Sequence, residues 1–208
     1  MSAVSLKNPI MLRNLSGEKL DEVHGSGYYD YLDDPEYTEN VTRAVARMVK
    51  DRLKNDFTSV IDVGCGAGAL AGMLPTWMRY LGLDASTEAI ARAEKRNNQM
   101  SRVFTVARIE DFCETVPHMG MFDIIHFGGI LCCLIRPEFR IPFVQRYVEK
   151  FKARFIIVSD LEGFDFKPLR ERFTMLDSET FHLDLPEQPV AKRHRCVEIY
   201  ATRVECDG

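Results

Sequence analysis

The residues with the clearest chemical potential lie in one run of nine, Val60-Ile61-Asp62-Val63-Gly64-Cys65-Gly66-Ala67-Gly68. Its apolar start predicts a buried strand, and glycine then follows Asp62 at every second position. Glycine suits such a turn because it adopts unusual dihedral angles and lets a ligand approach the main chain. A strand that ends in glycines and opens a helix, here Ala69–Leu74, is expected to present free backbone N–H groups to a ligand. The run therefore predicts a ligand site, with Asp62 placed to face a positively charged amino-acid moiety.

Two families of nucleotide-binding proteins fit these glycines. Gly64, Gly66 and Ala69 match the G-x-G-x-x-G/A pattern of dinucleotide sites, but a pyrophosphate would be repelled by Asp62. A dinucleotide domain would also take up most of the 208 residues. The run resembles more closely the first motif, Asp/Glu-x-Gly-x-Gly-x-Gly, of the class I S-adenosylmethionine-dependent methyltransferases. Its place behind a helical-looking N-terminal segment that could form a lid agrees with this resemblance.

The elements that must position this motif alternate along the chain. Short apolar strands followed by amphipathic helices predict a parallel sheet covered on both faces. The predicted strands are Ser59–Val63, Arg79–Leu83, Val103–Ala107, Phe122–Phe127 and Phe155–Ser159. The predicted helices are Ala69–Leu74, Ser86–Asn97, Gly129–Leu134, Pro137–Phe151 and Lys167–Arg172.

The C-terminal part changes character. Arg172–Leu176 and Cys196–Thr202 are two predicted strands with no helix between them, which indicates an antiparallel hairpin. The resemblance implies an α/β fold, a three-layer α/β/α Rossmann-like methyltransferase fold with a seven-stranded sheet. It implies the strand order 3-2-1-4-5-7-6, with the last strand antiparallel. We expect a lid segment over residues 1–35 and a class I methyltransferase domain over residues 36–208, together one domain.

The N-terminal segment carries an amphipathic helix and an aromatic cluster. Apolar residues recur at spacings of three and four between Pro35 and Leu53. The resemblance implies that Tyr28 and Tyr37 contact the cofactor from the lid, through packing or a cation–π attraction to its sulfonium. The alternative is that these rings only anchor a helix to the sheet.

The resemblance also assigns the rest of the cofactor site. Asp84 ends the second predicted strand and is expected to accept hydrogen bonds from the ribose hydroxyls, with Ala85 beside it and Ser86 as the cap of the next helix. The adenine contact has two registers, one through Arg108 and Ile109 and one through Glu110 or Asp111. Phe127, at the end of the fourth strand, is expected beside the methionine half. The residues implied for the methionine moiety are Asp62, Gly64, Cys65, Gly66 and Gly68.

Methyl transfer from a sulfonium is an in-line displacement that needs few catalytic groups beyond orientation of the nucleophile. His126 is the first candidate for a base, although a histidine inside an apolar strand is also typical of a hydrogen-bonded core residue. Asp160, after the fifth strand, and His24, before the tyrosine cluster, are the other candidates. The matching place after the fourth strand lacks the Asn/Asp-Pro-Pro-Tyr/Phe motif of enzymes that methylate planar amines. No charged cluster suggests a metal, so we expect none.

Composition limits the partners. The net charge of −4 and the isoelectric point near 5.8 argue against nucleic acid, which favours basic surfaces. The basic run Lys192–Arg195 is predicted to be a solvated hairpin loop. The six cysteines show no zinc-site spacing, which favours a reduced, cytoplasmic protein. Met1–Leu20 carries no long apolar stretch, so neither a signal peptide nor a membrane partner is expected.

The sequence thus predicts an enzyme that transfers a methyl group from S-adenosyl-L-methionine to an oxygen or nitrogen of a small-molecule acceptor, with S-adenosyl-L-homocysteine as product. Two alternatives stay open: a methyltransferase for RNA or protein, and a non-catalytic protein that binds S-adenosylmethionine. A homodimer is compatible with the sequence.

Overall fold

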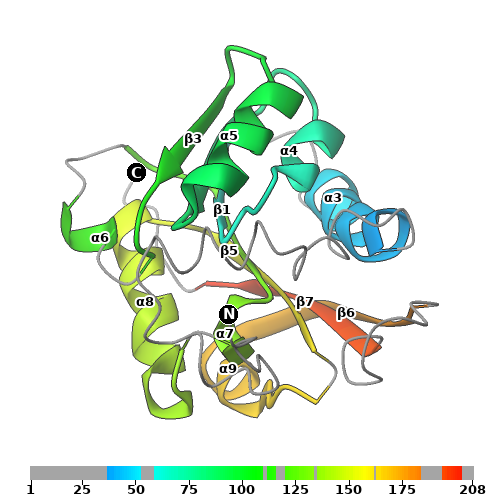
Figure 1. Cartoon of the computed structure of the whole chain (residues 1–208). Helices are drawn as coiled ribbons and strands as arrows, with labels where there is room; N and C mark the ends of the chain where they lie inside the picture. Colours follow the sequence, from blue (N-terminus) through cyan, green and yellow to red (C-terminus); the bar gives the residue numbers. More distant parts are fainter. Residues whose placement is uncertain are drawn as a thin grey trace, which may run out of the picture.

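A computed structural model describes residues 37–52, 59–109, 112–115, 120–133, 135–161, 163–183 and 194–202. Its strands form one sheet in the order β3-β2-β1-β4-β5-β7-β6 (Figure 1). Strands β1 to β5 run parallel, and β7 is antiparallel to both β5 and β6. The strand order and the antiparallel hairpin expected from the sequence are confirmed. The strands are β1 (Ser59–Val63), β2 (Arg79–Asp84), β3 (Arg102–Val106), β4 (Ile124–Gly128), β5 (Phe155–Leu161), β6 (Thr174–His182) and β7 (His194–Ala201).

Helices cover both faces of this sheet. The helical segment of residues 38–52, together with α4 and α5, packs on one face, and α6, α8 and α9 pack on the other (Figure 1). The helices are η3 (Thr38–Thr42), α3 (Arg43–Arg47), η4 (Met48–Arg52), α4 (Ala69–Met73), α5 (Thr87–Arg96), α6 (Phe112–Thr115), α7 (Ile130–Cys133), η6 (Pro137–Phe139), α8 (Arg140–Phe151) and α9 (Lys167–Arg172).

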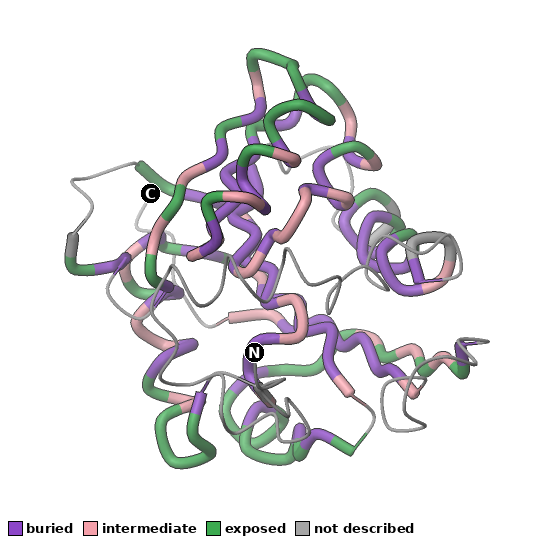
Figure 2. Tube along the Cα trace, viewed as in Figure 1, coloured by how far each residue is buried: buried purple, intermediate pink, exposed green. Residues whose placement is uncertain are grey.

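Strand β1 lies in the middle of the sheet and is buried on both faces. Successive side chains of a strand point to opposite faces. Ile61 and Val63 therefore pack toward α8, while Val60 packs toward the face covered by α4 and α5. This explains the continuous apolar pattern that predicted the strand. Figure 2 shows the central strands buried and the outer sides of the helices exposed.

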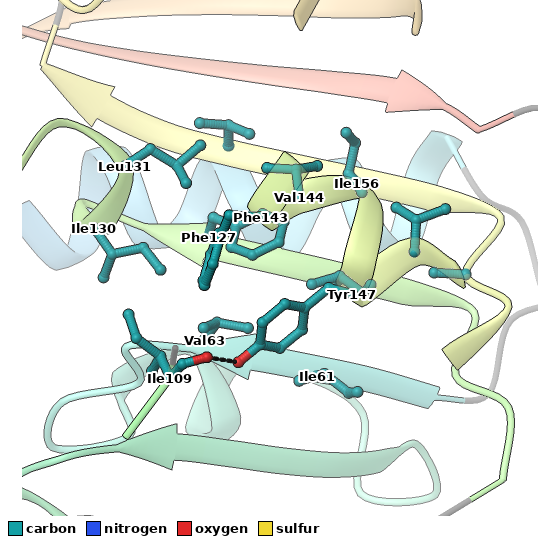
Figure 3. Packing of buried hydrophobic residues seen from close by; sticks show 14 of the residues in the cluster. Ile61, Val63, Ile109, Phe127, Ile130, Leu131, Phe143, Val144, Tyr147 and Ile156 are labelled. Atoms are coloured by element: carbon teal, nitrogen blue, oxygen red, sulfur yellow. Dashed lines mark hydrogen bonds between the residues drawn. The ribbon is translucent and has the colours of Figure 1, made fainter. Parts of the chain in front are cut away.

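The core on the α8 face is dominated by aromatic rings. The ring centroids of Phe127 and Phe143 lie 5.8 Å apart, and those of Phe127 and Tyr147 lie 5.7 Å apart. Figure 3 shows Ile61 and Val63 of β1 in the same cluster. This packing fixes the end of β4, and with it the position at which the chain turns toward α7.

Most predicted boundaries lie close to the observed ones, but β6 runs from Thr174 to His182 where a strand over Arg172–Leu176 was predicted. Strand β4 begins at Ile124 rather than Phe122, because the Asp123 side chain accepts hydrogen bonds from the main-chain N–H of Ser59, at 3.1 Å, and from its hydroxyl, at 2.7 Å. The interpretation of the basic run as a solvated loop is wrong for its last two residues. His194 and Arg195 begin β7, and Arg195 is buried. Lys192 and Arg193 lie outside the described residues.

Candidate cofactor site

The glycine turn after β1 depends on positive φ angles. They are 78° at Gly64, 51° at Gly66 and 73° at Gly68, in the left-handed region that favours glycine. A Cβ on Gly66 would meet no heavy atom within 4 Å, whereas a Cβ on Gly64 would lie 2.4 Å from Cγ2 of Ile130. The turn therefore packs against α7 at its start and leaves open space over Gly66.

The N–H groups of the turn are used within the protein. Those of Gly64 and Cys65 both donate to the carbonyl oxygen of Leu83, at 2.8 and 2.9 Å. The N–H of Gly68 donates to the carbonyl of Cys65 at 3.0 Å, and that of Gly66 donates to Asp84. The expectation of free donors is therefore wrong for these four residues. The turn offers a ligand room at its surface rather than a set of unpaired N–H groups.

Asp84 holds the turn from the end of β2. Its Oδ2 accepts from the N–H of Gly66 at 3.0 Å, and its Oδ1 accepts from the N–H of Ser86 at 2.9 Å. The carboxylate thereby links the glycine turn to the start of α5. The Ser86 hydroxyl accepts from the N–H of Ala89 at 3.1 Å, which confirms the predicted cap of α5. The half-buried Asp84 carboxylate thus stands beside the open space over Gly66, with Ala85 next to it.

Gly68 of the turn and Gly82 of β2 also allow close packing around the turn. A Cβ on Gly68 would lie 2.8 Å from Nδ2 of Asn97, which donates to the Gly68 carbonyl at 3.1 Å. A Cβ on Gly82 would lie 2.8 Å from Sγ of Cys65. Burial raises the pKa of the Cys65 thiol well above its usual value, and the nearby carboxylates of Asp84 and Asp62 add to the effect. Cys65 is therefore a neutral packing residue at the base of the turn.

Asp62 and His126 lie together beneath the turn, on neighbouring strands. His126 Nδ1 is 2.7 Å from Asp62 Oδ1, and Nε2 is 2.8 Å from the Ser159 hydroxyl. The Tyr80 hydroxyl donates to Asp62 Oδ2 at 2.5 Å. Asp62 is 3% exposed and His126 is 7% exposed. Both nitrogens of His126 therefore have partners, which corresponds to the interpretation as a hydrogen-bonded core residue.

Asp160 is fully buried near the end of β5. Its Oδ2 accepts from the N–H of Cys132 at 3.1 Å, and its Oδ1 accepts from the N–H of Leu161 at 2.9 Å. Burial raises the pKa of Asp160, although these hydrogen bonds and the charge of Arg195 act in the opposite direction. The carboxyl group thus links α7 to β5, and its role as a base stays a prediction.

Tyr37 is buried at the start of the N-terminal helical segment. The Arg195 guanidinium carbon lies 5.3 Å from the centre of its ring, within the range of a cation–π contact. Burial raises the pKa of the Tyr37 hydroxyl, and Arg195 partly offsets the shift. This environment fits the alternative that the ring anchors the helix to the sheet, and a cofactor contact of Tyr37 stays a prediction.

Ile109 and Phe127, which were expected near the adenine and the methionine moiety, are buried in the hydrophobic core. The Tyr147 hydroxyl donates to the carbonyl of Ile109 at 2.6 Å (Figure 3). Ile109 is 4% exposed and Phe127 is 0% exposed. Any ligand contact by Phe127 would therefore come from its main chain. His24, Tyr28, Glu110, Asp111 and the lid of residues 1–35 lie outside the described residues.

Sequence reasoning missed several residues that organise the site. Tyr80, Ser159 and Asn97 each place a polar group in a buried position, and all three are hydrogen-bonded. The only signal in the sequence was a single polar group within or just after an apolar element. Such a signal does not say which partner it meets. Across the described ranges, no three potential metal ligands come together, and no helix is long and apolar enough to cross a membrane.

Residues 60–152 match the family model described as "Methyltransferase domain". No curated protein matches the chain. The matched region runs from β1 to the end of α8, so it includes the glycine turn, Asp84 and the chain reversal after β4.

Solved structures share the fold at low sequence identity. The N-methyltransferase NodS from Bradyrhizobium japonicum WM9, in complex with S-adenosyl-L-homocysteine, has a TM-score of 0.66 and 16% identity, over 83% of this chain and 91% of that one. The magnesium protoporphyrin IX methyltransferase ChlM from Synechocystis PCC 6803, with bound S-adenosylmethionine, has a TM-score of 0.67 and 14% identity, over 97% and 100%. The plantazolicin methyltransferase BpumL, in complex with a pentazolic desmethylPZN analog and S-adenosyl-L-homocysteine, has a TM-score of 0.64 and 16% identity, over 94% and 96%. The methyltransferase fold that the sequence resemblance implied is confirmed.

Proposed function

We propose that this chain, which has the class I methyltransferase fold and matches a methyltransferase domain over residues 60–152, methylates an oxygen or nitrogen of a small-molecule acceptor. When bound, S-adenosylmethionine supplies a methyl group on a positively charged sulfur, which passes to the acceptor and leaves S-adenosylhomocysteine. The protein must then bind the two molecules, align them and exclude water.

The observation that carries the proposal is the pairing of Asp84 with Gly66. Asp84 accepts from the N–H of Gly66, and the space that a side chain would take at Gly66 is open. A carboxylate beside a main chain that a ligand can approach suits the two hydroxyls of a ribose, because hydroxyl groups donate hydrogen bonds to carboxylate oxygens. The site therefore fits a nucleoside whose remaining part extends along the glycine turn.

Asp62 has a different proposed role from the direct contact expected at first. Its two carboxylate oxygens are hydrogen-bonded to Tyr80 and His126 inside the protein. A buried negative charge beneath the turn still attracts a cation at the surface, because a low dielectric screens it weakly. We therefore assign Asp62 an electrostatic contribution to binding the cationic methionine half.

The chemistry is proposed to rest on positioning rather than on a dedicated base. The two nitrogens of His126 and the two oxygens of Asp160 all have partners within the protein. A reactive sulfonium needs mainly an aligned nucleophile.

Support for a small acceptor comes from the charge distribution and from the similar proteins. Arg195, the last residue of the basic run Lys192–Arg195, is buried against Tyr37. The similar solved proteins include the magnesium protoporphyrin IX and plantazolicin methyltransferases. The cytoplasmic location proposed from the cysteines is compatible with the four free thiols in the described part of the chain.

Calorimetric titration tests the proposal. The protein is titrated with S-adenosylmethionine, S-adenosylhomocysteine and NADH, and the titrations are repeated on Asp84→Ala and Asp84→Asn. We expect micromolar binding of both sulfur nucleotides, a loss of about tenfold or more in Asp84→Ala, and an intermediate loss in Asp84→Asn, since one hydrogen-bonded group is typically worth about 1–2 kcal/mol.

Glu171→Ala is the matched control, because Glu171 is an exposed carboxylate on α9 that pairs with Lys167. Preference for NADH, or equal binding by the Asp84 and Glu171 variants, would contradict the proposal. Binding of the sulfur nucleotides without turnover on any acceptor would instead favour the non-catalytic alternative.

A further inference from the structure

A pocket beside α7 has the composition of a binding site for an organic acid. Its volume is about 680 Å³, within the range of roughly 300–1,000 Å³ usual for small-molecule sites. The side chains that line it include those of Cys132, Arg140, Leu161, Phe164, Asp165 and His194.

The pocket adjoins the proposed cofactor site through α7. At the start of this helix, Ile130 fills the space against Gly64 of the glycine turn. At its other side, Cys132 lines the pocket and its N–H donates to Asp160. One short helix thus touches both sites, which is the relationship expected between a methyl donor and its acceptor.

Arg140 is held in place by its own neighbours. Its Nε donates to the carbonyls of Leu131, at 2.9 Å, and Ile135, at 3.3 Å. Its guanidinium carbon lies 4.6 Å from the centre of the Phe164 ring. Within the described ranges, its two terminal nitrogens make no hydrogen bond or ion pair. The side chain is therefore fixed at Nε and presents the end of its planar fork to the pocket.

The terminal nitrogens of an arginine match the geometry of a carboxylate group. Two parallel N–H···O hydrogen bonds join a guanidinium to a carboxylate in a planar arrangement, which a point charge such as lysine does not reproduce. Arg140 is the first residue of α8 and directly follows the short helix η6. Its guanidinium group is the side chain that would bind a carboxylate in this pocket.

The other lining residues further restrict the chemical class of the ligand. Leu161 and Phe164 provide apolar surface for the body of the molecule. Asp165 also lines the pocket, and its Oδ1 accepts from the N–H of Lys167. His194 is hydrogen-bonded to His182 at 3.1 Å.

We infer that this pocket binds the methyl acceptor, and that the acceptor is a small, largely apolar or aromatic molecule whose single carboxylate is held by Arg140. This inference rests on the proposed function. The carboxylate is the recognition group, and the oxygen or nitrogen that receives the methyl group lies elsewhere on the molecule.

Ligand-observed NMR with matched acids and amides tests the inference without requiring turnover. Saturation-transfer spectra are recorded with phenylacetate against phenylacetamide and with cinnamate against cinnamamide, in the presence of saturating S-adenosylhomocysteine. We expect each acid to bind the wild-type protein about tenfold more tightly than its amide. Arg140→Met is expected to abolish the preference, and Arg140→Lys to retain only part of it.

Arg136→Met is the matched control, since Arg136 is exposed and lies four residues before Arg140. It is expected to leave the preference unchanged. Equal binding of acids and amides to the wild type, binding of neither, or a preference that survives in Arg140→Met would overturn the inference. If Arg140→Met fails to fold, the more conservative variant Arg140→Lys tests the inference, through the expected partial loss of the preference for acids over amides.

The titration with S-adenosylhomocysteine separates the two proposals. Arg140 does not belong to the cofactor site, so the affinity for S-adenosylhomocysteine is expected to change less than twofold in all three variants. If the wild type binds S-adenosylhomocysteine but does not discriminate acids from amides, only the acceptor assignment falls. If the wild type does not bind S-adenosylhomocysteine, the proposed function itself falls.

Discussion

His126 on β4 and Asp62 on β1 occupy paired positions of neighbouring strands, with 2.7 Å between Nδ1 and Oδ1. Tyr80 on β2 and Ser159 on β5 extend this pair into a chain of side-chain hydrogen bonds across four adjacent strands. Because a carboxylate only accepts, Nδ1 carries the proton, and in the neutral ring Nε2 accepts from Ser159. The chain ties the centre of the sheet together just below the glycine turn.

Removing the histidine is expected to destabilise the protein markedly. His126→Ala leaves Asp62 and Ser159 each without one partner and opens a cavity, so we expect a loss of about 2–4 kcal/mol in the free energy of unfolding. Ser159→Ala removes one hydrogen bond and is expected to cost about 1 kcal/mol. Urea denaturation followed by circular dichroism measures both. Equal losses in the two variants would argue against the histidine as the centre of the chain.

A methyl group at Gly66 is expected to separate folding from binding. Gly66→Ala imposes a positive φ on an L-residue, which costs about 1–2 kcal/mol, but it meets no neighbouring atom within 4 Å. The same change at Gly120, with φ of 80°, meets only Nη1 of Arg79 at an ordinary 3.9 Å. We expect similar losses of stability in the two variants. Only Gly66→Ala should lose affinity for S-adenosylhomocysteine, by about tenfold or more in a calorimetric titration.

The stability of the folded protein is expected to depend on the ion pair between Glu198 and Arg170. Glu198 is fully buried on β7, and Arg170 of α9 and the Tyr200 hydroxyl both donate to it. Arg170→Met would leave a buried charge without its counterion, which is expected to cost roughly 2–4 kcal/mol. Arg146→Met breaks an exposed pair with Glu114 and should cost less than about 1 kcal/mol. Thermal unfolding of both variants compares them, and adding Glu198→Gln to Arg170→Met should restore part of the loss.

Asp160 is expected to leave a signature in the pH dependence of stability. Its pKa is raised above the usual value of 3.8, so the folded protein binds this proton more tightly than the unfolded chain does. The stabilisation from Asp160 is therefore fully present below about pH 3.8 and is lost as the pH rises through the folded pKa.

Asp160→Asn serves as the reference, because it cannot ionise. Urea unfolding of both proteins should show the wild type losing stability relative to the variant as the pH rises above about 4, with no further change once the carboxyl is ionised. A relative gain of the wild type over that interval would contradict the direction of the shift.

The cysteines are expected to differ in their rate of alkylation. Burial raises the pKa values of Cys113 and Cys196 to about 11, and the thiolate is the reactive form. Cys132 is half-buried and lines the proposed acceptor pocket. Treatment with iodoacetamide followed by tandem mass spectrometry should find Cys132 modified well before Cys65, Cys113 and Cys196. Modification of Cys113 at the rate of Cys132 in the folded protein would contradict this order.

The local parts of the site were predictable because their causes are local. The three glycines with positive φ, the Asp84 carboxylate at the end of β2 and the Ser86 cap all follow from residues a few positions apart. The strand order followed from the resemblance together with the alternation of strands and helices. Handedness and short connections leave few ways to arrange such elements.

The sequence by itself therefore determined most of the elements and the place of the glycine turn, and its resemblance to the methyltransferases implied the sheet order. Only the tertiary structure decided that the N–H groups of the turn bond to Leu83 and Asp84, that His126 faces Asp62 and Ser159, and that Arg195 is buried on Tyr37. The pocket around Arg140 is assembled from four separate segments in the same way. The physical reason is that dihedral preferences and periodicity act over a few residues. The partner of a polar side chain instead depends on strand register and on how helices pack over the sheet, which bring together residues far apart in the chain.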